Sequence, residues 1–152
     1  MTNAIAVFHK NNGSIHGTVE FIEENNKVKI IIDLAGLKKS AKHGFHVHEK
    51  GDLSNGCESM CAHYNPFGKK HGCPGMSERH VGDLGNLVTD IFGNANYSTT
   101  DTVIRLSGEY SIIGRGLIIH EDPDDCGLGN NAESLKTGNA GKRIACAVIG
   151  IK

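Results

Sequence analysis

Lys-Val-Lys-Ile-Ile-Ile-Asp-Leu, residues 27–34, sets charged side chains against apolar ones with a period close to two. Val28, Ile30 and Ile32 fall on one side of this segment, opposite two lysines. Because successive side chains of a β-strand point to opposite faces, the alternation predicts a strand with one face in a core and the other in water. Glu24-Asn25-Asn26, just before it, predicts a hairpin turn, since asparagine tolerates the positive φ that tight turns need.

Short segments of similar character recur along the chain, and turn residues separate them. Twenty glycines and the absence of tryptophan fit many turns and short strands. The pattern predicts no helix, and it predicts an all-β fold: an eight-stranded antiparallel Greek-key β-barrel or sandwich, as one domain over residues 1–152. The other expected strands are Ala4–Phe8, Ile15–Ile22, Gly44–His48, Gly85–Asp90, Ala95–Ile104, Gly114–His120 and Ile144–Ile151.

Composition excludes several classes of partner. The chain has 152 residues and a formal net charge of -1, which gives no general attraction to nucleic acid or to an anionic membrane surface. No apolar run is long enough to span a bilayer. The first ten residues carry no basic leader with an apolar core, so we expect a cytoplasmic protein without a membrane or nucleic-acid partner.

Two connections, residues 49–84 and 121–143, are too long for structureless loops in a compact domain, and we expect them to be functional. Residues 63–83 within the first hold His63, His71, His80 and Asp83. Three imidazoles and one carboxylate fill the four positions of a tetrahedral zinc site. The segment is too rich in proline, glycine and charge to be fixed by burial, so a bound metal would order it.

A different zinc site is open to the same loop by residue type alone. Cys61 and Cys73 could combine with His63 and His71 into a Cys/His site. That set would leave the other histidine and the aspartate of the segment without a role. Solvated loop histidines are the remaining alternative, and four ligand-type residues in so short a segment weigh against it.

His46 and His48 stand two residues apart in an expected strand, so they point to the same face and can grip one ion. The alternative is a solvated polar strand face. His120, at the end of another expected strand, and His63 would complete a ring of four imidazoles, which suits copper(II). With its two ring nitrogens, His63 can serve both metals.

Taken together, these motifs resemble an intracellular copper/zinc superoxide dismutase over essentially the full length of the chain. As a set they are highly specific. They are Gly44 to Glu49, His63 to Pro66, Lys70 to Gly72, Arg79 to Asn86, Gly114-Arg115, His120-Glu121, Asp124-Asp125, and Thr137 to Gly141 with Arg143.

The resemblance implies an enzyme that disproportionates superoxide to oxygen and hydrogen peroxide by cycling copper between Cu(II) and Cu(I), beside a structural zinc. It implies one copper and one zinc ion per chain. It also implies that His63 bridges the two ions and acts in catalysis by carrying a proton. The alternative is a copper/zinc storage or delivery domain without catalysis. The implied ligands are His46, His48, His63 and His120 for copper, and His63, His71, His80 and Asp83 for zinc.

Five further residues take roles from the resemblance. Asp124 would hydrogen-bond a histidine of each metal, although a turn cap is an alternative for it. Arg143 would dock the anion near copper, because guanidinium stays charged at any relevant pH. The resemblance and the positive charge of the loop assign steering to Lys136, Thr137 and Lys142.

Five cysteines are present, an odd number. The resemblance implies a disulfide between Cys57 and Cys146, an exception for a cytosolic protein. Cys61, Cys73 and Cys126 remain as extra thiols without an assigned role.

The resemblance also implies a homodimer joined through apolar surface at Gly51, Ile113-Gly114 and Val148 to Ile151. Position 144 is isoleucine, where relatives that depend strictly on a copper chaperone have proline. We therefore expect copper loading that does not strictly require a chaperone.

Overall fold

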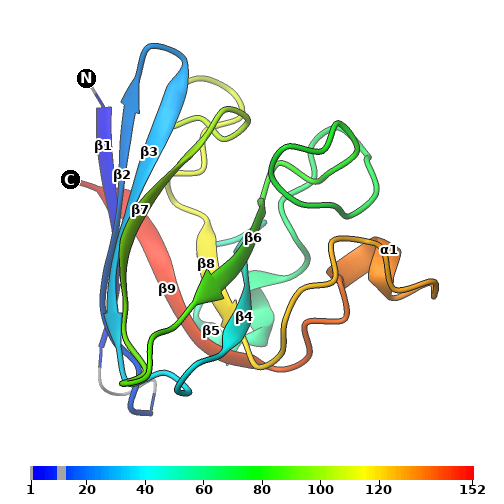
Figure 1. Cartoon of the computed structure of the whole chain (residues 1–152). Helices are drawn as coiled ribbons and strands as arrows, with labels where there is room; N and C mark the ends of the chain where they lie inside the picture. The colour runs from blue at the N-terminus through cyan, green and yellow to red at the C-terminus, as the bar shows by residue number, and fades with distance from the viewer. Residues whose placement is uncertain (1, 10–12) are drawn as a thin grey trace.

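The computed structural model describes residues 2–9 and 13–152. Its elements are β1 (Thr2–Phe8), β2 (His16–Glu24), β3 (Lys27–Ala35), β4 (Lys42–His48), β5 (Ser54–Cys57), the 3₁₀ turn η1 (Glu58–Met60), β6 (Asp83–Val88), β7 (Ala95–Asp101), β8 (Gly116–His120), α1 (Ser134–Thr137) and β9 (Arg143–Ile151). Within the described ranges, eight of the strands pair antiparallel in the order β6-β4-β8-β9-β1-β2-β3-β7, and the edge strands β6 and β7 contact each other, so the sheet forms a nearly closed barrel (Figure 1). This confirms the all-β prediction.

The alternation in β3 has the predicted consequence. Val28, Ile30 and Ile32 are buried, whereas the two lysines between and before them are exposed. Asn25 and Asn26, which join β2 to β3, have φ values of 54° and 62°. Positive φ at both central residues is the geometry of the predicted hairpin turn.

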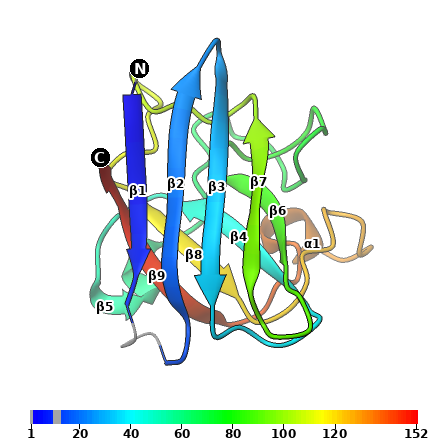
Figure 2. The same cartoon turned by 60° about the vertical axis from the view of Figure 1, so that its left-hand side comes forward.

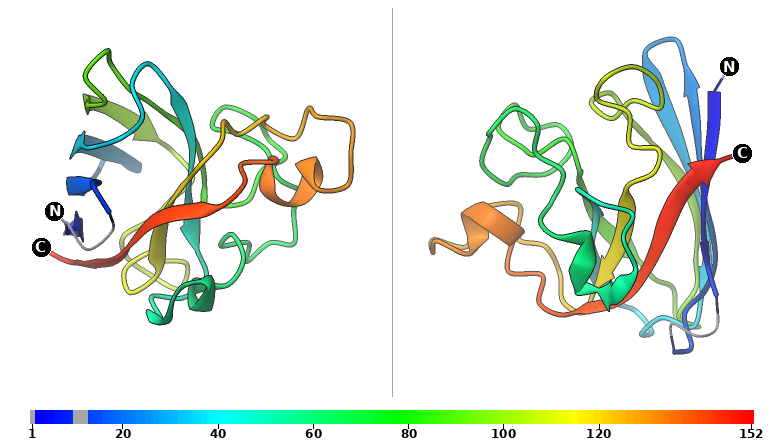
Figure 3. Two further views of the ribbon diagram at one scale, coloured as in Figure 1. Left: turned by 90° about the horizontal axis from the view of Figure 1, so that it is seen from below. Right: turned by 180° about the vertical axis from the view of Figure 1, so that it is seen from behind.

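The strand connections have the expected Greek-key character. β1, β2, β3 and β7 lie side by side (Figure 2). The chain leaves β3 to form β4 on the opposite side of the barrel and returns to pair with β3 only as β7, while β8 lies between β4 and β9 (Figure 3). Side chains from both sides, including Phe21, Ile30, Phe45, Leu117 and Ile149, fill the core. This packed frame fixes the strands that carry the site.

Several predicted boundaries are wrong, and local hydrogen bonds give the reason. β7 ends at Asp101 because this carboxylate accepts the backbone N–H groups of Val103 and Ile104 at 3.1 and 2.9 Å, which turns the chain. β8 begins two residues later than predicted, because the backbone N–H of Arg115 donates to the Ile112 carbonyl at 3.1 Å and forms a turn there. β6 starts and ends two residues earlier than predicted.

Both long connections project from the same side of the barrel (Figure 1). The first holds β5 and η1, and the second holds α1, so the expectation of no helix is wrong for these single turns. A four-residue helix is too short to leave a periodic pattern in the sequence. The two loops touch, because the backbone N–H of His71 donates to the Leu135 carbonyl at 2.9 Å.

Candidate metal centre

Two clusters of buried side chains lie between the barrel and the long loops, and they share one histidine. In each cluster, potential ligand atoms lie within 4.8 Å of one another. The predicted copper and zinc ligands are therefore brought together as two neighbouring sets. The clusters are His46, His48, His63 and His120, and His63, His71, His80 and Asp83.

The first set is built by strands β4 and β8 and by one loop residue. His46 and His48 point to the same side of β4, and His120 is the last residue of β8. An isolated β-bridge between His48 and His63 attaches the loop to β4. The ring of His63 lies 4.0 Å from that of His46 and 4.9 Å from that of His48, between ring centroids.

Hydrogen bonds on the outer side of each ring leave one nitrogen free on the inner side. His48 Nδ1 donates to the Cys61 carbonyl at 2.8 Å, and His120 Nδ1 donates to the Gly141 carbonyl at 3.1 Å. A carbonyl can only accept, so the Nε2 atoms of both rings carry the lone pairs, and they face each other at 3.4 Å. The inner atoms His46 Nδ1 and His63 Nε2 are buried without a hydrogen-bond partner among the described residues.

The second set converges on one carboxylate oxygen. Asp83 Oδ1 lies 3.0, 3.0 and 3.1 Å from the Nδ1 atoms of His63, His71 and His80. Asp83 Oδ2 accepts the backbone N–H groups of His80 and Gly72 at 2.8 and 2.9 Å, which fixes the carboxylate. Three ring nitrogens and one carboxylate oxygen aimed at a common point form the donor set that zinc accepts.

Asp124 connects the two sets from outside. Its carboxylate lies 2.5 Å from His46 Nε2 and 2.8 Å from His71 Nε2, and it is buried. Asn86 on β6 holds its backbone from both sides: the Asn86 side chain donates to the Asp124 carbonyl at 3.0 Å and accepts the Asp124 N–H at 2.7 Å. The turn-cap alternative is also realised, because the carboxylate accepts the Cys126 N–H at 2.7 Å.

Electrostatics favours neutral imidazoles in the first set. Burial lowers the pKa of His46 and of His48 well below the usual value, and the neighbouring His63 lowers both further. Burial also lowers the pKa of His120 to about 4. Neutral rings at physiological pH are the form that binds a metal ion.

Electrostatics around the second set favours a cation. Burial lowers the pKa of His71, but hydrogen bonds to Asp124 and Asp83 outweigh it and raise that pKa to about 9. Within the described residues, the ion pairs of these two buried carboxylates are with histidines. Buried carboxylates without lysine or arginine need a positive charge nearby, which a divalent ion supplies. The residues therefore fit both metals.

An open cavity of about 910 Å³ gives access to the first set. Arg143, the first residue of β9, lines it, and its guanidinium is fixed by backbone carbonyls: Nη1 donates to Cys57 at 2.8 Å and Nη2 to Cys61 at 2.6 Å. The loop residues predicted to steer an anion line the same cavity: Lys136, Thr137 and Lys142.

Arg79 and Asp101 form a buried pair next to the second set, and this pairing was not predicted from the sequence. Arg79 Nη1 donates to Asp101 Oδ1 at 2.6 Å, and both side chains are buried. Arg79 Nε also donates to the His80 carbonyl at 3.1 Å, which fixes the loop next to a predicted zinc ligand. Two residues distant in sequence reveal such a contact only when they are seen together in space.

The cysteines form two disulfides. Cys57 is joined to Cys146, as the resemblance implies. Cys73 is joined to Cys126, so the expectation that these two are extra thiols is wrong. In the described part of the chain, Cys61 is the cysteine outside both bonds.

The alternative Cys/His zinc site is also wrong. The sulfur of Cys73 is occupied by its disulfide, and the Cys61 thiol donates to the Ser59 carbonyl at 3.5 Å. The Cys73–Cys126 disulfide could not be predicted from the sequence, because disulfide connectivity does not follow from the number or spacing of the cysteines.

Comparison with known proteins gives consistent matches. The sequence model of the family described as "Copper/zinc superoxide dismutase (SODC)" matches residues 15–149. A "Superoxide dismutase [Cu-Zn]" of Paramecium bursaria Chlorella virus 1 is 61% identical over 97% of this chain and 78% of the viral protein. That of Cryptococcus neoformans is 51% identical over 99% of both chains.

Two further matches are a relative named as extracellular and a solved crystal structure. An "Extracellular superoxide dismutase [Cu-Zn]" of Drosophila melanogaster is 53% identical over 97% of this chain and 82% of the fly protein. The crystal structure of "the clock protein EA4" superposes with a TM-score of 0.95 at 46% identity, covering 99% of this chain and 95% of that one. Among the described residues, we find no helix of the length and apolarity needed to cross a membrane.

Proposed function

The chain belongs to the copper/zinc superoxide dismutase family, and we infer from this that it disproportionates superoxide into dioxygen and hydrogen peroxide. The reaction combines two superoxide anions with two protons, and it makes the protein an oxidoreductase. The observation that carries this function is the sharing of His63 between two buried donor sets, in a chain that matches the family along nearly its whole length.

The cofactors are one copper and one zinc ion per chain. Copper bound in the first set supplies one-electron redox chemistry, and zinc, which keeps one oxidation state, supplies fixed geometry. The inward ring nitrogens of the first set and the convergence on Asp83 Oδ1 support this assignment. We assign copper to His46, His48, His63 and His120, and zinc to His63, His71, His80 and Asp83.

The other side chains of the cavity bind and orient the substrate. The Arg143 guanidinium, held by two carbonyls, presents a permanent positive charge to superoxide. Lys136, Thr137 and Lys142 at the rim draw the anion inward. His63 Nε2 is buried without a partner among the described residues, and in the state in which it does not bind copper it can carry a proton to the peroxide product.

A storage or delivery domain would use the same ligands, and Arg143 argues against it. Storage has no use for a fixed guanidinium in an open cavity beside the copper set. Metal analysis of the purified protein and superoxide decay in its presence decide between the two functions. We expect one copper, one zinc and rapid decay. Full metal content without decay would leave storage as the function.

We further propose that residues 1–152 form one domain and that the protein is a homodimer. Leu53, Val148 and Ile151 are apolar residues that are 49, 36 and 79% exposed. Val148 lies close to Gly51, and Gly51 lies against Gly114, in the surface that the resemblance implies for a dimer. Sedimentation of the metal-loaded protein tests this, and a monomer at micromolar concentration would overturn it.

We propose the intracellular type, a cytoplasmic location and copper loading without strict need of a chaperone. The unqualified name of the Cryptococcus relative fits the first two, whereas the Drosophila relative is named extracellular. Two disulfides are unusual for the cytosol, so fractionation of producing cells is an informative test. We expect the protein in the cytosolic fraction, and copper-loaded even from cells without the chaperone. Recovery from the medium would contradict the location, and copper-free protein from those cells would contradict chaperone independence.

A further inference from the structure

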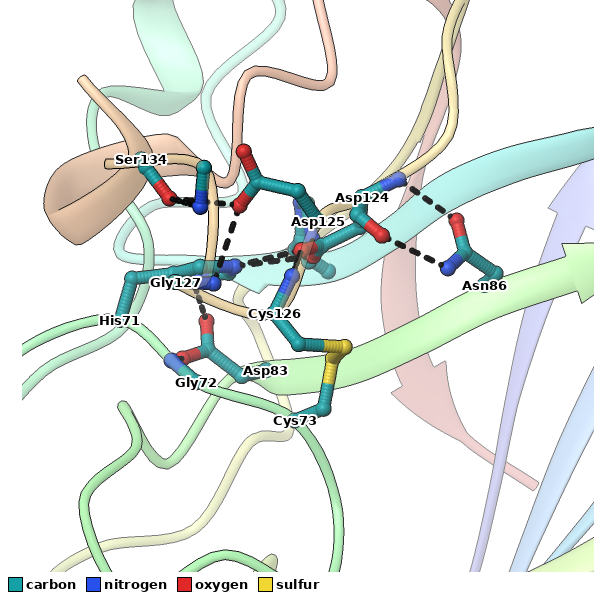
Figure 4. The surroundings of a disulfide bond; sticks show 12 residues. His71, Gly72, Cys73, Asp83, Asn86, Asp124, Asp125, Cys126, Gly127 and Ser134 are labelled. Atoms are coloured by element: carbon teal, nitrogen blue, oxygen red, sulfur yellow. Dashed lines mark hydrogen bonds and ion pairs between the residues drawn. A yellow bond between two sulfur atoms is a disulfide. The ribbon is translucent and has the colours of Figure 1, made fainter. Parts of the chain in front are cut away.

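The Cys73–Cys126 disulfide joins the two long loops directly beside the metal centre (Figure 4). Its cysteines are 53 residues apart in sequence. Cys73 belongs to the loop that carries His63, His71 and His80, and Cys126 belongs to the loop that carries Asp124. None of the roles proposed above uses this bond.

On both sides, the disulfide is two residues from a group of the site. Cys73 follows His71, with only Gly72 between them, and the Gly72 N–H donates to Asp83 Oδ2 at 2.9 Å. Cys126 follows Asp124 at the same distance in sequence, and its own N–H donates to Asp124 Oδ1 at 2.7 Å. The covalent bond and the contact between Asp124 and His71 therefore close one small ring, which Figure 4 displays.

The loops approach each other closely at this point. A Cβ atom added to Gly127 would lie 2.6 Å from the His71 carbonyl oxygen, so a glycine is needed next to Cys126. Cys126 itself has a φ of 60°, in the left-handed region that residues with side chains seldom adopt. A tight, otherwise unfavourable turn is thus held between the disulfide and the Asp124 carboxylate.

The Cys57–Cys146 disulfide does not provide this link. It ties the start of the first loop to β9, whereas Asp124 and His71 lie in the second loop and in the far part of the first. Besides the disulfide, hydrogen bonds join the two loops near this site, from Asp124 to His71 and from His71 to Leu135. Hydrogen bonds to His46 and Asn86 tie Asp124 to the barrel. Without Cys73–Cys126, the position of the Asp124 carboxylate would depend on hydrogen bonds alone.

We propose that Cys73 and Cys126 are positioning residues, whose disulfide holds the Asp124 carboxylate against His71 and His46 and so slows release of zinc from the centre. The proposal rests on the metal assignment made above. Partners that orient a histidine ligand change metal affinity by about 10–100-fold. A disulfide that fixes such a partner is expected to act through it on the same scale.

The test is zinc release from the copper- and zinc-loaded protein. In the double variant Cys73→Ser/Cys126→Ser, we expect release to a chelator about 10-fold faster or more than in the wild type. We also expect a changed copper(II) paramagnetic resonance spectrum, because His46 loses its fixed orientation. Ile30→Ala serves as the control: it removes a buried side chain from β3, which carries none of the ligands, so it lowers thermal stability and should leave zinc release unchanged.

A double-mutant cycle that combines the cysteine variant with Asp124→Asn tests whether the disulfide acts through Asp124 or by a general increase in loop mobility. If the disulfide acts through Asp124, removing the bond from the Asp124→Asn protein should not accelerate zinc release further. Fully additive effects, or zinc release as slow in the double variant as in the wild type, would overturn the proposal.

Partial reduction of the wild type covers the case in which the double variant does not fold. Mass mapping of the cysteines should then show zinc loss in step with opening of Cys73–Cys126, and loss that follows only Cys57–Cys146 would overturn the proposal. Failure of the metal assignment gives a different result from failure of this proposal. If the zinc ligands are wrongly assigned, a His80→Ala variant would contain as much zinc as the wild type.

Discussion

Arg143 and His48 donate to the same acceptor, the carbonyl oxygen of Cys61, at 2.6 and 2.8 Å. One backbone oxygen of the first loop therefore orients both a copper-set imidazole and the charged group beside it. Because Cys57, four residues earlier, supplies the second carbonyl to Arg143, the first disulfide also restrains this guanidinium. The proposed docking residue and a proposed copper ligand are thus oriented by the same short segment.

Replacing Arg143 by isoleucine should lower the superoxide rate by roughly 10-fold or more, because the anion loses its docking charge in the cavity. Copper and zinc content should stay at wild-type levels, since Arg143 contacts carbonyls and no ligand atom. Pulse radiolysis together with metal analysis measures both quantities.

In the wild type, the superoxide rate should fall as salt concentration rises, because the Debye length shrinks from ~10 Å at 0.1 M to ~3 Å at 1 M.

Two variants serve as controls for this prediction. Arg143→Lys keeps the charge but loses the planar fork that fits two carbonyls, so we expect an intermediate rate. Lys142→Ser removes a charge from the rim and should have the smaller effect. A wild-type rate independent of ionic strength, or full activity of the isoleucine variant, would assign anion guidance to other residues.

His63→Ala should uncouple the two metal sets and remove most of the activity. The variant keeps three imidazoles in the copper set and three ligands in the zinc set, so both metals should bind more weakly. The copper(II) absorption and paramagnetic resonance spectra should change, because copper loses the ligand that it shares with zinc. An unchanged copper spectrum would contradict the bridge.

The strand pattern was predictable because burial acts on every second residue. β3 shows it most clearly: Val28, Ile30 and Ile32 are inside, the two lysines beside them are exposed, and only Ile31 between them is apolar and half-buried. The same reasoning placed His46 and His48 on one face of β4. The single turns η1 and α1 escaped prediction, because elements this short are held by loop contacts and leave no period in the sequence.

Contacts between loops were the least predictable part. The pairing of Cys73 with Cys126 depends on how two long connections fold over the barrel, and three unassigned cysteines allow more than one pairing. The supporting contacts of Asn86 and Asp101 could not be predicted, since Asn86 holds the backbone of the distant Asp124 and Asp101 holds the distant Arg79 side chain. A zinc ligand set concentrated in one segment could be predicted from the residues, whereas of its supports only Asp124 was expected, and that from the family resemblance.

Arg79→Met should destabilise the metal-loaded protein by about 3–5 kcal/mol, because Asp101 would remain as a buried charge without its partner. Urea unfolding measures the change. Lys152→Ala is the matched control: the Lys152–Glu20 pair is 2.6 Å long, but its side chains are 46 and 27% exposed, so its loss should cost less than about 1 kcal/mol. Equal losses in the two variants would contradict the structural role of the buried pair.

Gly138→Ala should weaken zinc binding although Gly138 supplies no ligand atom. An added Cβ would lie 2.2 Å from Asp124 Oδ1 and 2.5 Å from His71 Nε2, so the carboxylate and the imidazole would have to separate. Competition with a chelator should show zinc affinity reduced by about 10-fold.

At Gly138, the φ of 73° adds backbone strain of about 1–2 kcal/mol for any residue with a side chain, and this strain alone would lower the melting temperature. Gly108→Ala isolates that contribution, because Gly108 has a φ of 81° and an added Cβ there would meet no atom within 4 Å. We expect both variants to melt earlier and only Gly138→Ala to lose zinc more readily. Equal zinc affinity in the two variants would mean that the contact between Asp124 and His71 does not control zinc retention.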